Sequence, residues 1–193
     1  MSAPVALGDV LLVLLNGQPS NAFDLHQRHT LLLGPEQAVD IRRFTTTVNR
    51  LARSGHVRLE RVISPHNKNQ NRPRCVLTAA GQHRQQSWLT DVTEHASLEE
   101  IYTKGILAVD SADLATFEAF ISTSLAAAHL RQRNLTDATA EGSPAMSARL
   151  AFEDGMIKAT ATWLRHLSNL RPSAVAAPSC PPAAPPVPRQ VRI

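Results

Sequence analysis

The sequence has few of the residues on which several classes of protein depend. Its two cysteines, Cys75 and Cys180, are too few and too far apart for a disulfide scaffold or a four-cysteine zinc site. No apolar run approaches the roughly twenty residues of a membrane-spanning helix, and no basic residue precedes the N-terminal apolar stretch as in a signal peptide. We therefore expect a cytoplasmic protein with no membrane partner.

Motifs of the common enzyme classes are missing as well. The sequence contains no Gly-x-Ser-x-Gly elbow, no phosphate-binding loop and no Gly-x-Gly-x-x-Gly. Glu99 and Glu100 are adjacent and would point to different faces of a helix, so they form no convergent carboxylate pair. His26 and His29 could share a helix face, but no spacing supplies a third metal ligand. The sequence predicts neither catalysis nor a metal or other cofactor.

The charge is unevenly distributed, and Lys68 is the single lysine of the first 93 residues. Residues 1–93 hold 11 Lys and Arg against 6 Asp and Glu, a net charge of +5. Residues 94–171 carry −3 and residues 172–193 carry +2, which leaves the chain at +4. Because arginine forms bidentate contacts with phosphate and guanine, the first part is suited to DNA.

Apolar spacing and capping residues predict three helices near the N-terminus, over 4–15, 20–30 and 40–54. Ser20 and Asp40 are expected to cap the second and third helices. The residues expected in the core of these helices are Val10, Leu11, Leu14, Leu15, Phe23, Leu25, Ile41, Phe44, Val48 and Leu51.

After Gly55 the pattern changes to the alternation typical of a β-strand, over 57–63. A polar turn over 64–74 and a second short strand over 75–77 follow. Thr78 is then placed to cap a fourth helix that carries Trp88 and Leu89. Three helices, a β-hairpin and a fourth helix, in that order, predict a winged helix-turn-helix.

The remaining sequence is helical in pattern up to residue 171, with a helix capped by Asp110 or Ser111 and a last helix ending near Leu170. The last helix carries two adjacent apolar stripes of seven-residue period, which predict helix–helix dimerisation. The stripes are Leu150, Ile157 and Leu164, and Met156, Trp163 and Leu170.

We therefore expect a mainly α chain with a minor β component and three parts. A winged helix-turn-helix DNA-binding domain spans 1–93, and a helical dimerisation and effector domain spans 94–171. Residues 172–193 are a Pro- and Ala-rich tail, expected to be disordered.

Three stretches resemble the PadR family of transcriptional regulators. DVLLVLLNGQPSNAFDL (9–25) is similar to the family's first two helices, and RFTTTVNRLARSGHV (43–57) is similar to its recognition helix and the following turn. VLTAAGQHRQQSWL (76–89) is similar to its Leu-Thr-x-x-Gly and Trp-Leu pattern after the wing. The family usually has an aromatic residue at the position of Thr45, and this chain does not. The resemblance implies a homodimeric repressor that binds double-stranded DNA and is often released from it by a small-molecule effector.

Recognition helices present exposed side chains to the major groove, where arginine reads guanine, asparagine adenine, and threonine the thymine methyl. The wing would contact the phosphate backbone, and the start of the second helix could donate to a phosphate. The candidate DNA-binding residues are Ser20, Asn21, Arg42, Arg43, Thr45, Thr46, Thr47, Asn49, Arg50, Lys68, Arg72 and Arg74.

Two questions stay open at the level of sequence. The aromatic residues of the second half either line a pocket for a flat ligand or simply form its core. The candidate pocket residues are Trp88, Phe117, Phe120 and Trp163. The alternative to a DNA-binding regulator is a winged-helix module that binds a protein, although residues 64–74 contain no carboxylate and so favour DNA.

Overall fold

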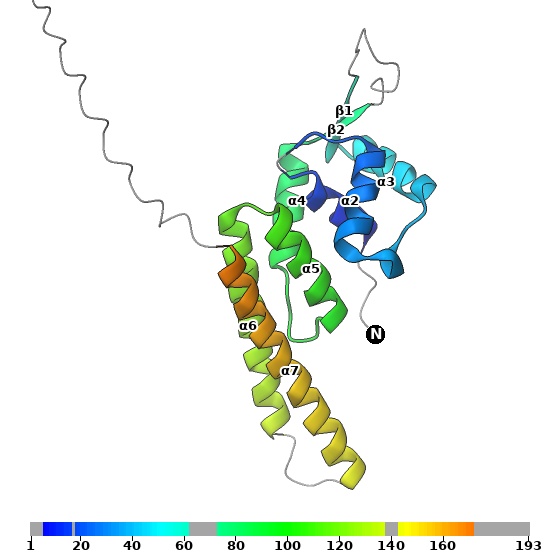
Figure 1. The fold of residues 1–193 in the computed structure, drawn as a ribbon. Coiled ribbons are helices and arrows are strands. Elements are labelled where there is room, and N and C mark those ends of the chain that lie inside the picture. The colour runs from blue at the N-terminus through cyan, green and yellow to red at the C-terminus, as the bar shows by residue number, and fades with distance from the viewer. Residues whose placement is uncertain (1–5, 17, 62–72, 138–142, 172–193) are drawn as a thin grey trace, which may run out of the picture.

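The computed structural model describes residues 6–16, 18–61, 73–137 and 143–171. Within these ranges the chain is mainly helical with one antiparallel pair of strands, which confirms the predicted fold class (Figure 1). The elements are α1 (Leu7–Leu14), α2 (Ala22–Leu33), the 3-10 helix η1 (Pro35–Gln37), α3 (Ile41–Arg53), β1 (Val57–Glu60), β2 (Arg74–Leu77), α4 (Ala79–Thr90), α5 (Leu98–Ser111), α6 (Leu114–Asp137) and α7 (Pro144–Leu170).

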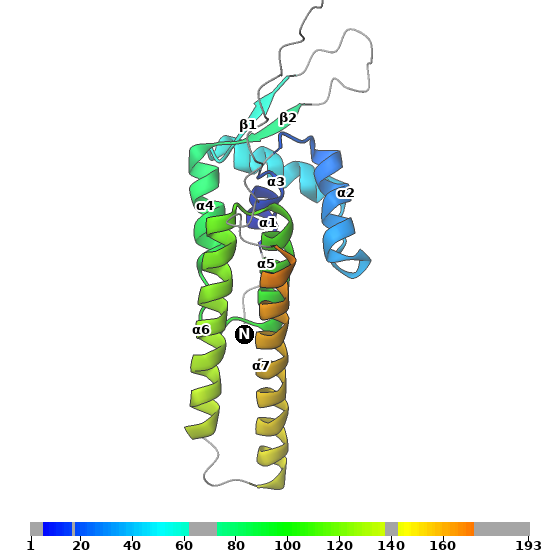
Figure 2. The ribbon, with the colours of Figure 1, turned by 60° about the vertical axis from the view of Figure 1, so that its left-hand side comes forward.

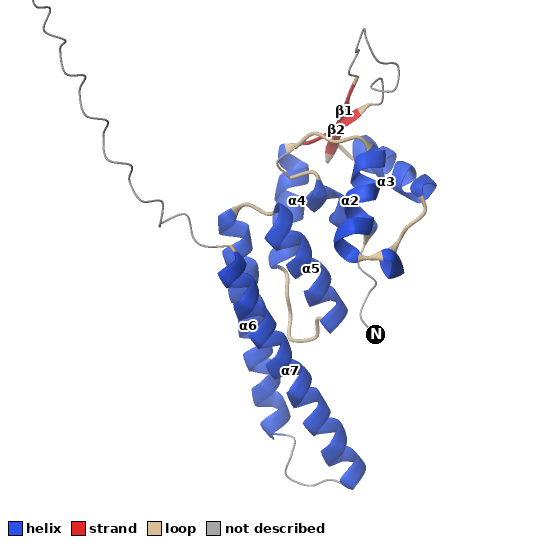
Figure 3. Cartoon of the chain, viewed as in Figure 1, coloured by secondary structure: helices blue, strands red, loops and turns tan. Residues whose placement is uncertain are grey.

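The first part of the chain has the element order of a winged helix-turn-helix. Strands β1 and β2 pair antiparallel, with Val57 opposite Leu77 and Glu60 opposite Arg74. A backbone bridge between Ser20 and Cys75 ties the segment before α2 to β2, with N–O distances of 3.2 and 2.8 Å. In the molecule as a whole, the pair of strands lies at the opposite end from the α6–α7 hairpin (Figure 3).

Two of the predicted caps are confirmed, and two are wrong. Asp40 caps α3 and Thr78 caps α4, as expected. The cap of α2 is Asn21 instead of Ser20, because the Ser20 backbone is extended and bonded to β2. Helix α5 continues to Ser111, so the side chain that caps α6 belongs to Asp113 and not to Asp110 or Ser111.

One hydrophobic core connects both parts of the chain. Helix α1 is buried along nearly its whole length, as expected of a helix that is apolar on all sides. Its leucines belong to the same cluster as Leu107 of α5, Phe117 of α6 and Leu164 of α7. Two residues expected in this core, Phe23 and Ile41, are instead 43% and 38% exposed. No helix among the described residues is long and apolar enough to cross a bilayer.

Helices α6 and α7 run antiparallel and extend together beyond the rest of the molecule (Figure 2). Ile157 and Leu164 of α7 are 4% and 0% exposed, on a helix that packs against both α6 and α5. These two residues of the predicted dimer stripe are therefore already covered within the same chain, whereas Leu150, the third, is half-buried. The dimer interface itself stays a prediction. Of the second predicted stripe, Met156 and Trp163 are half-buried and Leu170 is 58% exposed.

Candidate nucleic-acid interface

Helix α3 buries one face and presents a polar face to solvent. Phe44, Val48 and Leu51 are buried beneath the helix. The side chains on the opposite face recur at helical spacing, so they form one continuous strip. This strip, called the α3 outer face below, consists of Arg42, Thr46, Asn49 and Arg53, all of which are exposed.

The arginines of α3 carry no ion pair within the described part of the chain. The nearest carboxylate in sequence is Asp40, and its side chain accepts the Arg42 backbone N–H at 2.6 Å as the helix cap. The positive charge of Arg42 and Arg53 is therefore uncompensated locally and available to an anion. Arg53 is not among the residues that the sequence selected for DNA contact, although its spacing of eleven residues from Arg42 places both on one helix face.

Helix α2 holds α3 in place through an aromatic contact. The rings of His26 and His29 meet the buried Phe44 ring edge-on, with centroids 5.1 and 5.2 Å apart. The His26 Nε2 lies 2.7 Å from the carbonyl oxygen of Val39, just before α3 begins. Burial, and to a lesser extent the neighbouring His26, lower the pKa of His29. His29 thus acts as a neutral packing residue, and its Nδ1 atom has no hydrogen-bond partner among the described residues.

The three consecutive threonines have different environments. Each hydroxyl donates to the backbone carbonyl four residues earlier, at 3.0 Å for Thr45, 2.9 Å for Thr46 and 2.8 Å for Thr47. Thr45 and Thr46 are exposed, so their methyl groups and hydroxyl lone pairs remain available. Thr47 is 6% exposed, and its selection as a DNA contact is wrong because it faces α1.

Two further arginines flank the α3 outer face. Arg43 and Arg50 are both exposed, seven residues apart on the side of the helix that is nearest α1. The Arg50 guanidinium lies back over α1, with Nη2 3.6 Å from the position that a Cβ would occupy at Gly8. Arg50 could therefore contact DNA only at the edge of α3 that lies beside α1, whereas Asn49 lies on the α3 outer face.

The base of the wing is less basic than its sequence suggests. Arg58 of β1 pairs with Glu60 of the same strand at 2.6 Å, and Glu60 lies opposite the exposed Arg74 in the strand register. The two other predicted wing contacts, Lys68 and Arg72, lie outside the described residues.

The N-terminus of α2 is occupied by its own side chains. The Asn21 Oδ1 accepts the backbone N–H groups of Phe23 and Asp24, each at 3.0 Å. The Asn21 amide nitrogen donates to the Asp24 carboxylate at 2.7 Å, and the Ser20 hydroxyl donates to the Gln18 carbonyl at 3.4 Å. A phosphate bound there would have to displace these bonds and approach Asp24, so this end of the site is weaker than predicted.

The strands and α4 are joined to α3 through one close backbone contact. Gly55 ends α3 with a φ of +74°, and the next residue, His56, turns its carbonyl toward the start of α4. That carbonyl accepts the Thr78 backbone N–H at 3.1 Å, and the Thr78 hydroxyl donates to the Gly55 carbonyl at 2.7 Å. Gly81 leaves the space for this contact, since a Cβ there would lie 2.1 Å from the His56 oxygen.

The four candidate pocket aromatics do not line a common cavity. Phe117 and Phe120 are 2% and 0% exposed within the core. Trp88 lies beneath the Lys104 ammonium, and Trp163 packs against Gly105. The interpretation of these residues as core is therefore favoured. A groove of about 520 Å³ lies lower on the α6–α7 hairpin, and none of the four aromatic residues lines it.

The elements and contacts above define a winged helix-turn-helix followed by a helical hairpin. No protein-family model matches the chain, and no curated protein matches it in sequence. The chain is similar to the solved structure of Bacillus subtilis PadR in complex with operator DNA, at 15% identity and a TM-score of 0.42. That alignment covers 88% of this chain and 100% of PadR. It is also similar to smu.1604c from Streptococcus mutans UA159, at 15% identity and a TM-score of 0.37, over 82% of this chain and 96% of the other.

Proposed function

We propose that this chain is a sequence-specific DNA-binding transcriptional regulator whose helix α3 enters the major groove. The observation that carries the proposal is the α3 outer face, where Arg42 and Arg53 are exposed and unpaired within the described residues and Asn49 lies between them. Arginine can contact phosphate or guanine, and asparagine can pair with adenine. Residues 1–93 would form the DNA-binding part, and such a regulator would work in the cytoplasm.

The regulator would act as a homodimer held by the second part of the chain, 94–171. Apolar side chains remain exposed on α7, among them Leu170 at 58%, Phe152 at 68% and Met146 at 44%. A second copy would bury them, and two α3 helices would then read two half-sites of a palindromic operator. Repression, and its release by a small molecule, follow from the resemblance to the PadR family and would be tested by transcription from the bound promoter.

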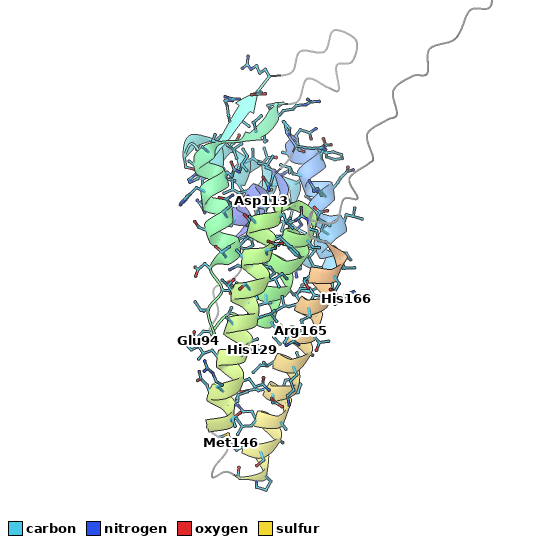
Figure 4. All side chains as sticks on the ribbon, turned by 90° about the vertical axis from the view of Figure 1, so that its left-hand side faces the viewer. Glu94, Asp113, His129, Met146, Arg165 and His166 are labelled. Carbon is cyan, nitrogen blue, oxygen red and sulfur yellow. The ribbon has the colours of Figure 1, made fainter. Side chains whose placement is uncertain are left out.

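The test is fluorescence anisotropy with duplex DNA from upstream of the chain's own gene, against a scrambled duplex, over a salt series. The variants are Arg42→Ala/Arg53→Ala and Asn49→Ala. The matched control is Arg165→Ala, which removes an arginine that is also exposed, from α7 (Figure 4). Loss of four phosphate contacts per dimer should reduce the salt slope by about 3–4, since each contact contributes about 0.9.

Asn49→Ala should leave the salt slope unchanged and lower the preference for the upstream duplex by about 1–3 kcal/mol, the value of one bidentate base contact. Arg165→Ala should bind as the wild type does. An unchanged affinity and slope in Arg42→Ala/Arg53→Ala would contradict the assignment of α3. If the wild type binds no duplex at low salt, the winged helix is instead a protein-interaction module.

A further inference from the structure

Several polar contacts join the part of the molecule that contains α3 to one segment between α5 and α6, in addition to the hydrophobic core that both parts share. This segment, called the junction turn below, consists of Asp110 and Ser111 at the end of α5 and of Ala112 and Asp113, which link α5 to α6. Arg28 of α2 reaches it, with Nη2 2.5 Å from the Asp110 carboxylate and 3.1 Å from the Ser111 hydroxyl. The other guanidinium nitrogen, Nη1, donates to the Leu14 carbonyl at the end of α1 at 3.1 Å. One side chain therefore joins α1, α2 and α5.

The junction turn is held from other directions as well. The Asn16 amide, just after α1, donates to the Ser111 carbonyl at 2.8 Å. The Gln86 amide of α4 donates to the Asp113 carboxylate at 3.4 Å, at the end of α6 that lies beside α4 (Figure 4). Close by, the guanidinium of Arg171, the residue after α7, donates to the Ala108 carbonyl of α5 at 3.2 Å and lies over the Phe117 ring of α6, so it joins the two helices on either side of the junction turn.

These contacts differ in kind from the apolar packing around them. Apolar packing is non-directional, whereas hydrogen bonds and charge-assisted arginine contacts constrain angle as well as distance. Helix α2 in turn carries α3 through His26, His29 and Phe44. A change in the Arg28 contact would therefore be transmitted through α2 to α3.

We propose that the junction turn sets the orientation of α3 relative to the α6–α7 hairpin, with Arg28 and Asp110 as positioning residues for DNA recognition. The proposal rests on the proposed function, because in a dimer held by α6 and α7 this orientation sets the separation of the two α3 helices. Each base pair adds about 3.4 Å along the duplex, so a shift of that size in each protomer changes the preferred half-site spacing by about two base pairs. The Arg28–Asp110 contact is thus a determinant of operator spacing although neither residue lies on the α3 outer face.

The first measurement is binding to a set of duplexes in which the distance between half-sites is changed one base pair at a time. Arg28→Met removes all three contacts of that side chain, and Asp110→Asn removes the charge while keeping the shape. The control is Arg149→Met, which breaks the Arg149–Glu153 pair inside α7. In the Arg28 and Asp110 variants the preference for the best spacing over its neighbours should fall by up to about fivefold, the factor that corresponds to loss of a partly exposed ion pair worth up to about 1 kcal/mol. The salt slope of both variants should match that of the wild type. The control should show the wild-type preference for half-site spacing.

The second measurement does not depend on DNA. Spin labels at Arg53→Cys and Ser168→Cys, in a chain that also carries Cys180→Ser, report the distance from α3 to α7 within one protomer when labelled chains are diluted with unlabelled ones. Arg28→Met and Asp110→Asn should broaden or shift this distance distribution, and Arg149→Met should not. An unchanged distribution, or a spacing preference as sharp as that of the wild type, would overturn the proposal. If the wild type binds no duplex, the proposed function fails, and the distance distribution still decides whether the junction turn sets the orientation.

Discussion

The contact between the turn after α3 and the start of α4 predicts that Gly81→Ala destabilises the winged-helix part of the chain. A Cβ at residue 81 would lie 2.1 Å from the His56 carbonyl oxygen and 2.8 Å from Cδ1 of Leu77. The first of these atoms is backbone, so no side-chain rotation relieves the overlap. The turn after α3, or the whole of α4, would have to move by about 1 Å to restore an ordinary contact.

The expected cost combines three effects. Overpacking of a tightly packed site costs about 1–3 kcal/mol. The same movement stretches the bonds from the Thr78 N–H to His56 and from the Thr78 hydroxyl to Gly55, each worth about 0.5–1.5 kcal/mol. Alanine recovers about 1 kcal/mol because it favours the helical backbone more than glycine does. The free energy of unfolding should therefore fall by about 2–4 kcal/mol.

Urea denaturation of the purified chain, followed by circular dichroism, measures this loss. Gly155→Ala is the matched control, because it makes the same change within α7, where a Cβ would meet no atom within 4 Å. We expect that control to be as stable as the wild type or more stable, by up to about 1 kcal/mol. A Gly81→Ala variant that unfolds at the wild-type urea concentration would refute the close approach of His56 to α4.

Three other predictions concern packing and titration. Gly105→Ala should lower stability by about 1–2 kcal/mol, less than Gly81→Ala, because its Cβ would lie 2.5 Å from the Trp163 ring, a side chain that can yield; urea denaturation tests this order. Because the pKa of His29 is lowered in the folded state, the unfolded chain takes up that proton first, so the stability that neutral His29 contributes is present above its ordinary value of 6.5 and is lost as the pH falls below it. The melting temperature of His29→Gln should therefore fall less between about pH 7.5 and 5.5 than that of the wild type, and an equal fall would contradict this assignment. Burial raises the pKa of the Cys75 thiol to about 11, so in a Cys180→Ser chain Cys75 should react with a thiol reagent only after denaturation; fast reaction in the native chain would contradict its burial.

Local chemistry was sufficient to predict the winged helix. Asp40 and Thr78 supply side-chain oxygens at the starts of α3 and α4, and Gly55 tolerates the positive φ at which α3 ends. These signals act within a few residues of sequence, so they can be read without knowing the fold. The cap of α2 could not be read in this way, because Ser20 is bonded to Cys75, a residue 55 positions further along the chain.

It was harder to predict from the sequence which residues of α3 are exposed and which are buried. A helix wheel places Thr47 beside exposed neighbours, but α1 packs over it and leaves it 6% exposed. Ile41 fits the apolar face of α3 by spacing, yet it lies in the first turn, where the packed elements do not fully cover it, and it is 38% exposed. Both differences depend on where the neighbouring helices end, which the period of a single helix does not specify.

The apolar stripes of α7 are a second case in which the period of one helix does not specify its neighbours. A seven-residue period indicates that a helix packs against another helix, but it does not indicate whether the partner belongs to the same chain. Here helices of the same chain cover Ile157 and Leu164, whereas Phe152, which belongs to neither stripe, is 68% exposed. The surface available to a second copy is therefore defined by the length and position of those helices.

The structure also shows which of the described charged side chains of residues 1–93 are paired and which are not. Four of the acidic side chains in this part are engaged in helix caps or in pairs with other side chains. These residues are Asp9, Asp24, Asp40 and Glu60. The four arginines of α3 have no such partner within the described residues, so four uncompensated positive charges lie along one helix. Under the proposed function, a duplex would therefore meet that charge beside the side chains that can read bases, which would couple electrostatic attraction to the correct orientation of α3.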